Sequence, residues 1–459
     1  MKDNIDFGTA DIKILFRKML YPTVASMVFT ALFIIVDGIF VGKGVGSDAL
    51  AAVNIVAPVW LFATSIGLMA GMGGAVIASV NIARGKPEIA RINMTQALSV
   101  SSLFLLVCSV LVLVYTDTVL HLLGCSRQLY TPAKYYIWGF VPFMAVNALL
   151  CSTQFFIRLD ASPRYAMTAN VIATVLNIIF DYLFIFIFNW GIFGAAIATS
   201  LGSIVGVAIM LRYLSRSANQ MHLVPLKVSR RAMRYMLRNI VYICKIGLPS
   251  FLSEITIAAM MLCGNYVFIS HIGEPGVAAF SIACYFFPII FMLYSSIAQS
   301  AQPIISYNYG ISYLPRVHSA FKISLKAALV CGVLFFAGTA VFREPITLLF
   351  IDSDDTAYPI SVSGLPLFAA GMIPFAVNII SIGYFQSIKR VGCAMLVTVL
   401  RGFVFITGAF LVVPRFLGVP GIWLSVPAGE VLTSVLVFAI YAVTRYKERH
   451  GKVMEINAI

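Results

Sequence analysis

Charged side chains occur inside long apolar stretches of this sequence, where they are unusual. The five are Asp37, Asp181, Glu254, Arg401 and Glu430. Each costs roughly 2.5 to 3.5 kcal/mol on membrane-insertion scales, so such residues normally face a protein interior or a water-filled cavity and take part in function. Two carboxylates in a water-poor cavity can take up a proton near neutral pH or bind a monovalent cation through oxygen ligands. Their presence therefore predicts a proton or cation site.

Asp37 and Asp181 are the main candidates for that site. Asp37 lies about 10 Å beyond the centre of the first apolar run, at 1.5 Å per residue, and Asp181 lies beyond the centre of the fifth. Thr199, near the start of the sixth run, falls at a similar depth. Polar residues of the fifth run share one helical face, at spacings of 4, 3 and 4, and these are Asn170, Thr174, Asn177 and Asp181. We expect a proton or cation site made of Asp37, Asn177, Asp181 and Thr199. The alternative is that these groups only hydrogen-bond the helices together.

The remaining charged residues suggest other roles. Arg401 and Glu430 both lie near the middle of their runs, so we expect them to neutralise one another as a structural ion pair. Glu254 has no obvious partner, and together with Gln299 it is a candidate second cation or substrate site; the alternative is a locally satisfied acid. Pro22 removes a backbone hydrogen bond in the first run and is a candidate hinge, the alternative being a static kink.

The composition excludes a soluble protein. Hydrophobic residues make up 60% of the 459 residues, charged residues make up 11%, and the mean hydropathy is +0.95. Soluble domains contain about half and about a quarter of these classes. Apolar runs of about 20 to 30 residues, each long enough to span a bilayer, recur twelve times. The sequence predicts an all-α polytopic membrane protein with twelve transmembrane helices.

The distribution of Lys and Arg orients these helices. With the N-terminus inside, 26 of the 32 basic residues lie on the inner side and five lie in outer loops. This asymmetry is typical of inner loops, so we expect both termini to be cytoplasmic. The net charge of +14 then reflects membrane insertion, and no nucleic-acid partner is expected. The eight cysteines show no CxxC spacing, so we expect neither disulfides nor a metal site beyond a monovalent cation, and no organic cofactor.

The chain divides into two similar halves. A basic segment near residues 212–245 separates six spans from six, which predicts an N-terminal lobe (1–220), a basic cytoplasmic linker (221–240) and a C-terminal lobe (241–459). A shift of 227 residues aligns Gly46 with Gly273 and Gly191 with Gly418. Two parallel copies are typical of transporters that rock two bundles. The second copy lacks the paired acids, since Gly264 and Gly408 take their places.

Several stretches resemble one known family. The run from Val36 to Gly46 resembles the first-helix signature of MATE (multidrug and toxic compound extrusion) transporters. So do the runs from Asn177 to Asp181 and from Gly191 to Thr199. Residues 158–163 (RLDASP) and 385–389 (FQSIK) resemble the short loops that follow the fourth and tenth spans of the family. The similarity covers nearly the whole chain and is greatest with the compact bacterial members.

The resemblance implies a fold and an activity. It implies two pseudo-symmetric six-helix bundles in a V around a central cavity. It also implies export of bulky, often cationic amphipathic compounds in exchange for H⁺ or Na⁺, by alternating access. The expected setting is the lipid bilayer of the bacterial cytoplasmic (inner) membrane, with the chain acting as a monomer.

The resemblance also assigns roles to matching positions. The cation network of the first lobe corresponds to Asp37, Asn177, Asp181 and Thr199, and the bend of the first helix corresponds to Pro22. Glu254 resembles the seventh-helix acid of some branches. Those branches also carry a tenth-helix acid, where this chain has Asn378.

Two other activities are alternatives. A flippase of the same superfamily would move lipid-linked saccharides and would need a cationic cavity for pyrophosphate, whereas the spans supply only Arg401. A polytopic membrane enzyme would need a nucleophile, a metal or a cluster of His and Asp at one interface. The five histidines are instead scattered near loops and the C-terminal tail.

Overall fold

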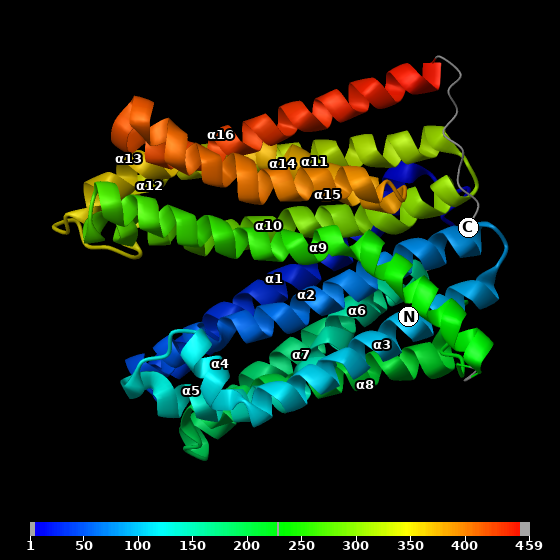
Figure 1. Cartoon of the computed structure of the whole chain (residues 1–459), viewed down its shortest axis with the longest axis horizontal. Coiled ribbons are helices and arrows are strands. Elements are labelled where there is room, and N and C mark those ends of the chain that lie inside the picture. The colour runs from blue at the N-terminus through cyan, green and yellow to red at the C-terminus, as the bar shows by residue number, and fades with distance from the viewer. Residues whose placement is uncertain (1–4, 227–228, 450–459) are drawn as a thin grey trace. The chain divides into compact units, whose positions relative to one another are not determined.

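The chain is helical along its length (Figure 1). The computed structural model describes residues 5–226 and 229–449, and within these ranges it contains no strand. The first half forms α1 (Ile12–Gly44), α2 (Ser47–Ala83), α3 (Pro87–Val114), α4 (Thr116–Leu122), α5 (Arg127–Phe140), η1 (Val141–Phe143), α6 (Met144–Leu159), α7 (Pro163–Tyr182), η2 (Leu183–Ile187), α8 (Gly191–Arg212) and η3 (Tyr213–Ser217). The second half forms α9 (Arg230–His271), α10 (Glu274–Gly310), α11 (Leu314–Val341), α12 (Arg343–Leu348), α13 (Ala357–Ala369), α14 (Met372–Ser387), α15 (Val391–Val399), η4 (Leu400–Ile406) and α16 (Thr407–Arg449).

These helices account for the predicted number of spans. Among the described residues, ten helical segments are long and apolar enough to cross a membrane, and α13 with α14, bent by 42°, forms an eleventh. One of the ten, Val391–Val443, has 53 residues. Its helical length of about 80 Å is more than twice the ~30 Å thickness of a bilayer core. The backbone breaks inside it at Gly418 (φ 60°, ψ −138°), so this segment holds two spans and the total reaches twelve.

Both halves turn at matching positions. Gly46 (φ 123°) and Gly273 (φ 87°) precede the second long helix of each half, while Gly191 (φ 57°) and Gly418 (φ 60°) stand where the sixth begins. Each pair is separated by 227 residues, the offset of the internal repeat. A positive φ strains any residue with a Cβ, which explains why glycine occupies these turns in both copies.

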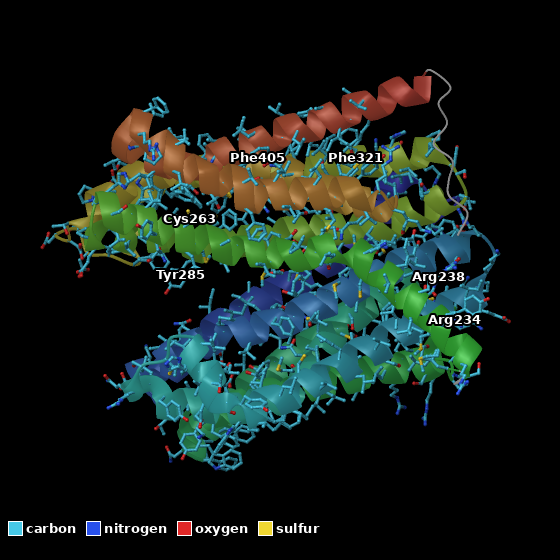
Figure 2. All side chains as sticks on the ribbon, in the orientation of Figure 1. Arg234, Arg238, Cys263, Tyr285, Phe321 and Phe405 are labelled. Carbon is cyan, nitrogen blue, oxygen red and sulfur yellow. The ribbon has the colours of Figure 1, made fainter. Side chains whose placement is uncertain are left out.

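The structure forms two compact units. Unit 1 contains residues 1–251, 299–320 and 387–389, and unit 2 contains residues 252–298, 321–386 and 390–459. Residues 230–240, which we expected to belong to the linker, form the first turns of α9. Arg234 and Arg238 are exposed on these turns (Figure 2). The lobe boundaries at residues 220 and 240 stay a prediction.

Small residues bring the helices of unit 1 close together. α2 packs against α6 and α3, and α7 packs against α8 and α1. A Cβ on Gly67 would lie 2.6 Å from the carbonyl oxygen of Ala148, and one on Gly71 would lie 2.9 Å from the Cα of Ser152. Neither position has room for a side chain. The stripe of small residues on α2 therefore sets the close approach to α6, as such stripes do in membrane helices.

Asp160, in the short loop after α6, organises the end of unit 1. Its carboxylate accepts hydrogen bonds from the backbone N–H groups of Asn219 (2.6 Å), Gln220 (2.7 Å) and Met221 (2.9 Å). The hydroxyl of Tyr213 donates a fourth bond at 2.7 Å. Asp160 is only 3% exposed. The carboxylate therefore fastens the segment after α8 to the loop between α6 and α7.

Replacing this carboxylate should weaken the fold. We expect Asp160→Asn to lower the free energy of unfolding by about 2 kcal/mol or more, because bonds to a charged acceptor contribute about 1.5 to 3 kcal/mol each and the amide cannot accept all four. The midpoint of thermal unfolding of the purified protein in detergent measures the effect. Asp352→Asn, at an exposed acid, is the matched control and should leave the midpoint unchanged. Equal midpoints for both variants would contradict the role of Asp160.

Candidate cation-binding site

Asp37 of α1 and Asp181 of α7 face one another in unit 1. Their carboxyl groups lie within hydrogen-bonding reach of each other. Asp181 is fully buried, and among the described residues no donor reaches either of its carboxyl oxygens or Oδ1 of Asp37. Ionised carboxylates can only accept hydrogen bonds, so these two cannot satisfy one another without a proton or a cation between them. The structure thus brings together the two acids that the sequence pointed to.

Asn177 and Thr199 lie on α7 and α8, which pack against one another. Asn177 precedes Asp181 by one turn of α7, is 4% exposed, and has an Oδ1 without a hydrogen-bond donor among the described residues. Thr199 of α8 is 9% exposed, and its hydroxyl donates to the carbonyl of Ala195 at 3.2 Å, which leaves its oxygen lone pairs free to accept. Carboxylate, amide and hydroxyl oxygens are the ligands that hard cations prefer.

Close packing between α7 and α8 holds this arrangement. A Cβ on Gly202 would lie 2.8 Å from the carbonyl oxygen of Ala173 and 2.9 Å from the Cβ of Asn177. The missing side chain at Gly202 therefore lets α8 approach the turn of α7 that carries Asn177. Thr199 lies three residues before Gly202 on α8, so this contact also fixes the position of Thr199.

Tyr136 of α5 is a site residue that the sequence analysis missed. It is 7% exposed and lies within electrostatic range of both Asp37 and Asp181. No spacing pattern identifies it, because α5 is placed by its packing against α2 and α8. Its phenol is a neutral group near the acids, and it donates to none of their three buried oxygens.

The other predicted residues lie elsewhere. Pro22 is buried inside α1, which stays helical from Ile12 to Gly44, and its missing N–H leaves the carbonyl of Lys18 without its helical partner. Glu254 belongs to unit 2, is partly buried, and forms no hydrogen bond or ion pair with another described residue. Gln299 belongs to unit 1, where its Oε1 accepts a bond from Arg158 at 2.7 Å. The structure therefore gives the last two different surroundings.

Arg401 and Glu430 form a buried ion pair in unit 2. Nε of Arg401 donates to Oε1 of Glu430 at 2.8 Å, and the two side chains are 1% and 0% exposed. Asn378 donates to the second oxygen of Glu430 at 2.7 Å, and the guanidinium stacks over the ring of Phe375 at 4.5 Å. Both oxygens of this acid are satisfied, in contrast to the pair in unit 1.

A buried arginine of unit 1 also escaped the sequence analysis. Arg158 is 3% exposed and bonds to the amides of Gln154 and Gln299. It falls at the very end of the fourth apolar run, so it reads as a loop residue. The two signals that could have found it are the RLDASP motif and the polar residue one turn earlier, at Gln154.

Comparisons with known proteins agree with these observations. The sequence model of the MatE family matches residues 22–183 and again 249–411, and the two matches begin 227 residues apart. The multidrug export protein MepA of Staphylococcus saprophyticus is 23% identical over 439 residues, covering 94% of each chain. A protein of Shewanella oneidensis named FAD transporter is 24% identical over 358 residues, covering 76% of this chain and 77% of its own.

Solved structures share the fold. A MOP superfamily transporter from Pyrococcus furiosus superimposes with a TM-score of 0.84 at 21% identity, over 95% of this chain and 97% of the other. A variant of the Vibrio cholerae MATE transporter VcmN superimposes with a TM-score of 0.85 at 20% identity, over 94% and 97%. At this identity the likeness concerns the fold alone.

The contact at Gly202 can be tested by filling it. We expect Gly202→Ala to lower the thermal unfolding midpoint, because overpacking against a backbone carbonyl costs about 1 to 3 kcal/mol and outweighs the ~1 kcal/mol that alanine contributes inside a helix. Gly338→Ala on α11, where no atom lies within 4 Å of the added Cβ, is the control and should raise the midpoint slightly. A midpoint for Gly202→Ala at or above that of the control would show that α8 does not depend on this contact.

Proposed function

Because the chain belongs to the MATE family of efflux transporters, we propose that it is a cation-coupled antiporter that exports amphipathic organic compounds in exchange for H⁺ or Na⁺. Membership makes it a multi-pass membrane transporter rather than an enzyme. The observation that carries the coupling is the contact between Asp37 and Asp181, whose buried oxygens lack donors. A transporter that exchanges cargo for a cation needs such a site, because the entering ion must bind where it can alter the conformation of the protein.

Competition between cation and cargo provides the exchange. In the proposed cycle, cargo leaves toward the outside when an entering cation neutralises Asp37 and Asp181, with Asn177 and Thr199 as neutral oxygen ligands. The first helix then changes its path near Pro22, where a backbone hydrogen bond is already missing. One positive charge that enters down 100 mV supplies about 2.3 kcal/mol. One pH unit adds about 1.4 kcal/mol for a proton.

The cytoplasmic membrane of a bacterium is the proposed setting. Both termini lie on the cytoplasmic side in this proposal, since the sequence places most Lys and Arg there. Exposed Arg234 and Arg238 on the first turns of α9 agree with that orientation. The N-terminal lobe handles the cation, because the acid pair has no counterpart at Gly264 and Gly408.

The buried charges favour cationic or neutral cargo over anionic cargo. Among the described residues, two arginines are buried, Arg158 and Arg401, and both are bonded to protein groups, with only Nη1 of Arg401 lacking an acceptor. An anionic dinucleotide, such as the cargo that the name of the Shewanella relative indicates, or a lipid-linked pyrophosphate would need free cationic groups. Amphipathic cations of the kind a multidrug exporter handles need only acids and apolar surface.

Transport by reconstituted protein tests this proposal. We expect Asp37→Asn to reduce gradient-driven efflux of ethidium from proteoliposomes at least tenfold, because the amide cannot take up a proton or neutralise a cation. Proton and sodium gradients imposed separately identify the ion, since only the coupling gradient drives efflux. Fluorescence of the released dye measures the rate.

The matched control is an acid outside the spans. Asp117→Asn changes an exposed residue of α4 in the same way and should leave efflux unchanged. Full gradient-driven efflux by Asp37→Asn would overturn the assignment of the cation site.

A further inference from the structure

A continuous chain of hydrogen bonds runs through unit 1. Arg158 of α6 donates through Nη1 to Oε1 of Gln299 on α10 (2.7 Å) and through Nη2 to Oε1 of Gln154 (2.9 Å). Nε2 of Gln154 donates in turn to Oδ1 of Asn170 on α7 (3.1 Å). Three helices are thus joined by four buried or partly buried side chains.

The chain ends on α1, the helix that carries Asp37. Nδ2 of Asn170 donates to Oγ1 of Thr30 (3.1 Å) and to the carbonyl oxygen of Ser26 (3.3 Å). Asn170 shares one face of α7 with Asp181. The helix α1 is therefore in contact with the same face of α7 at two levels, through Asn170 near its middle and through Asp181 further out.

Arg158 sets the direction of every bond in this chain. A guanidinium can only donate, whereas a side-chain amide can present either its oxygen or its NH₂ group. Because Arg158 requires the oxygen of Gln154, the NH₂ group of Gln154 points to Asn170. Asn170 must then present its own oxygen to Gln154, and its NH₂ group points to α1. Without Arg158 both amides could turn over, and α1 would lose its two donors.

The guanidinium depends on these amides in return. Arg158 is 3% exposed and pairs with no carboxylate among the described residues. Its other neighbour is the ring of Phe155, 5.6 Å from the guanidinium carbon. A buried positive charge held by neutral acceptors is sensitive to the loss of any one of them. A change at Asn170 should therefore alter the hydrogen bond between Arg158 and Gln299.

Gln299 stands at the start of a segment of α10 that packs on α1 and α2. The hydroxyl of Ser300 lies 3.5 Å from the carbonyl oxygen of Met19, and that of Ser79 lies 3.5 Å from the carbonyl oxygen of Pro303. All four residues belong to unit 1. The side chain of Ser79 is fully buried in this contact.

We propose that Arg158 is a positioning residue that couples the cation site to this contact, by orienting the amides of Gln154 and Asn170 toward α1 while holding Gln299 of α10. When a cation enters at Asp37 and Asp181, α1 shifts and withdraws the acceptors of Asn170. The amides reorient, Arg158 releases Gln299, and the segment of α10 separates from α2. This coupling rests on the proposed function. The hydrogen bond from Arg158 to Gln299, and its role in holding α10, does not.

Alkylation of one buried cysteine measures the separation. The eight native cysteines are first replaced, and Ser79→Cys is introduced as the reporter in full-length protein in lipid nanodiscs. The rate of reaction with a hydrophilic maleimide then reports how often α10 leaves α2. We expect Arg158→Gln to raise this rate at least tenfold and Arg158→Lys, which keeps a donor but not the fork, to raise it by less. Arg234→Gln, at an exposed arginine of α9, should leave it unchanged.

One double-mutant comparison and one further variant distinguish coupling to the cation site from a general loosening of the contact between α10 and α2. We expect Asp37→Asn, which mimics a neutralised acid, to raise the rate at least threefold in protein with Arg158 and to add nothing in protein with Arg158→Gln. Gln299→Glu replaces a neutral acceptor by a charged one of the same shape, so it should slow alkylation even if Arg158→Gln fails to fold.

Each part of the proposal has a result that would overturn it. Multiplying effects of Asp37→Asn and Arg158→Gln, or no effect of Asp37→Asn on alkylation, would overturn the coupling. An unchanged alkylation rate in both Arg158→Gln and Gln299→Glu would overturn the claim that the bond between Arg158 and Gln299 holds α10 against α2. Full efflux by Asp37→Asn would instead overturn the proposed function, and the Gln299→Glu arm would still test the contact between α6 and α10.

Discussion

Two acidic side chains that face each other inside an apolar bundle are the costly feature around which unit 1 is arranged. Burying an ionised group without a partner costs several kcal/mol, so the fold must either satisfy these oxygens or leave them for a cation. Helices α1 and α7 supply the two acids. The position of α7 depends in turn on close packing with α8, where Gly202 meets Asn177. The geometry of the acid pair therefore depends on how neighbouring helices pack.

The second half of the chain stabilises a buried carboxylate in a different way. Its buried acid, Glu430, accepts bonds from Arg401 and from Asn378, and Ser434 in turn donates to Asn378 at 3.0 Å. The charge is neutralised within unit 2, and the group is satisfied without a ligand. The acid pair of unit 1 and Glu430 of unit 2 are thus buried in opposite ways. The buried oxygens of the pair lack donors among the described residues, whereas Glu430 has a permanent counter-charge in Arg401.

Much of this arrangement could be predicted from the sequence, for physical reasons. Apolar length and the positions of Gly and charge predict the spans, and helical periodicity places Asn177 and Asp181 on one face of α7. Depth along a span predicts that Asp37 lies level with Asp181, and the same argument pairs Arg401 with Glu430. A helix has a fixed rise and a fixed repeat, so depth and face follow directly from position in the sequence.

Contacts that depend on tertiary packing could not be predicted in this way. Tyr136 is brought near the acids by the packing of α5 on α2 and α8, and Arg158 falls at the end of a span, where charge is ordinary. The hydrogen bond that Gln299 accepts from Arg158, far away in sequence, also had no signal in the local pattern. The direction of each amide also depends on its whole neighbourhood, which no local pattern contains.

The glycine at residue 418 divides the last long apolar segment into two helices. A continuous helix through this point would make one overlong rod of the segment that now crosses the bilayer twice, and the number of crossings would become odd. A single residue without a side chain therefore marks the point where one long apolar segment becomes two helices.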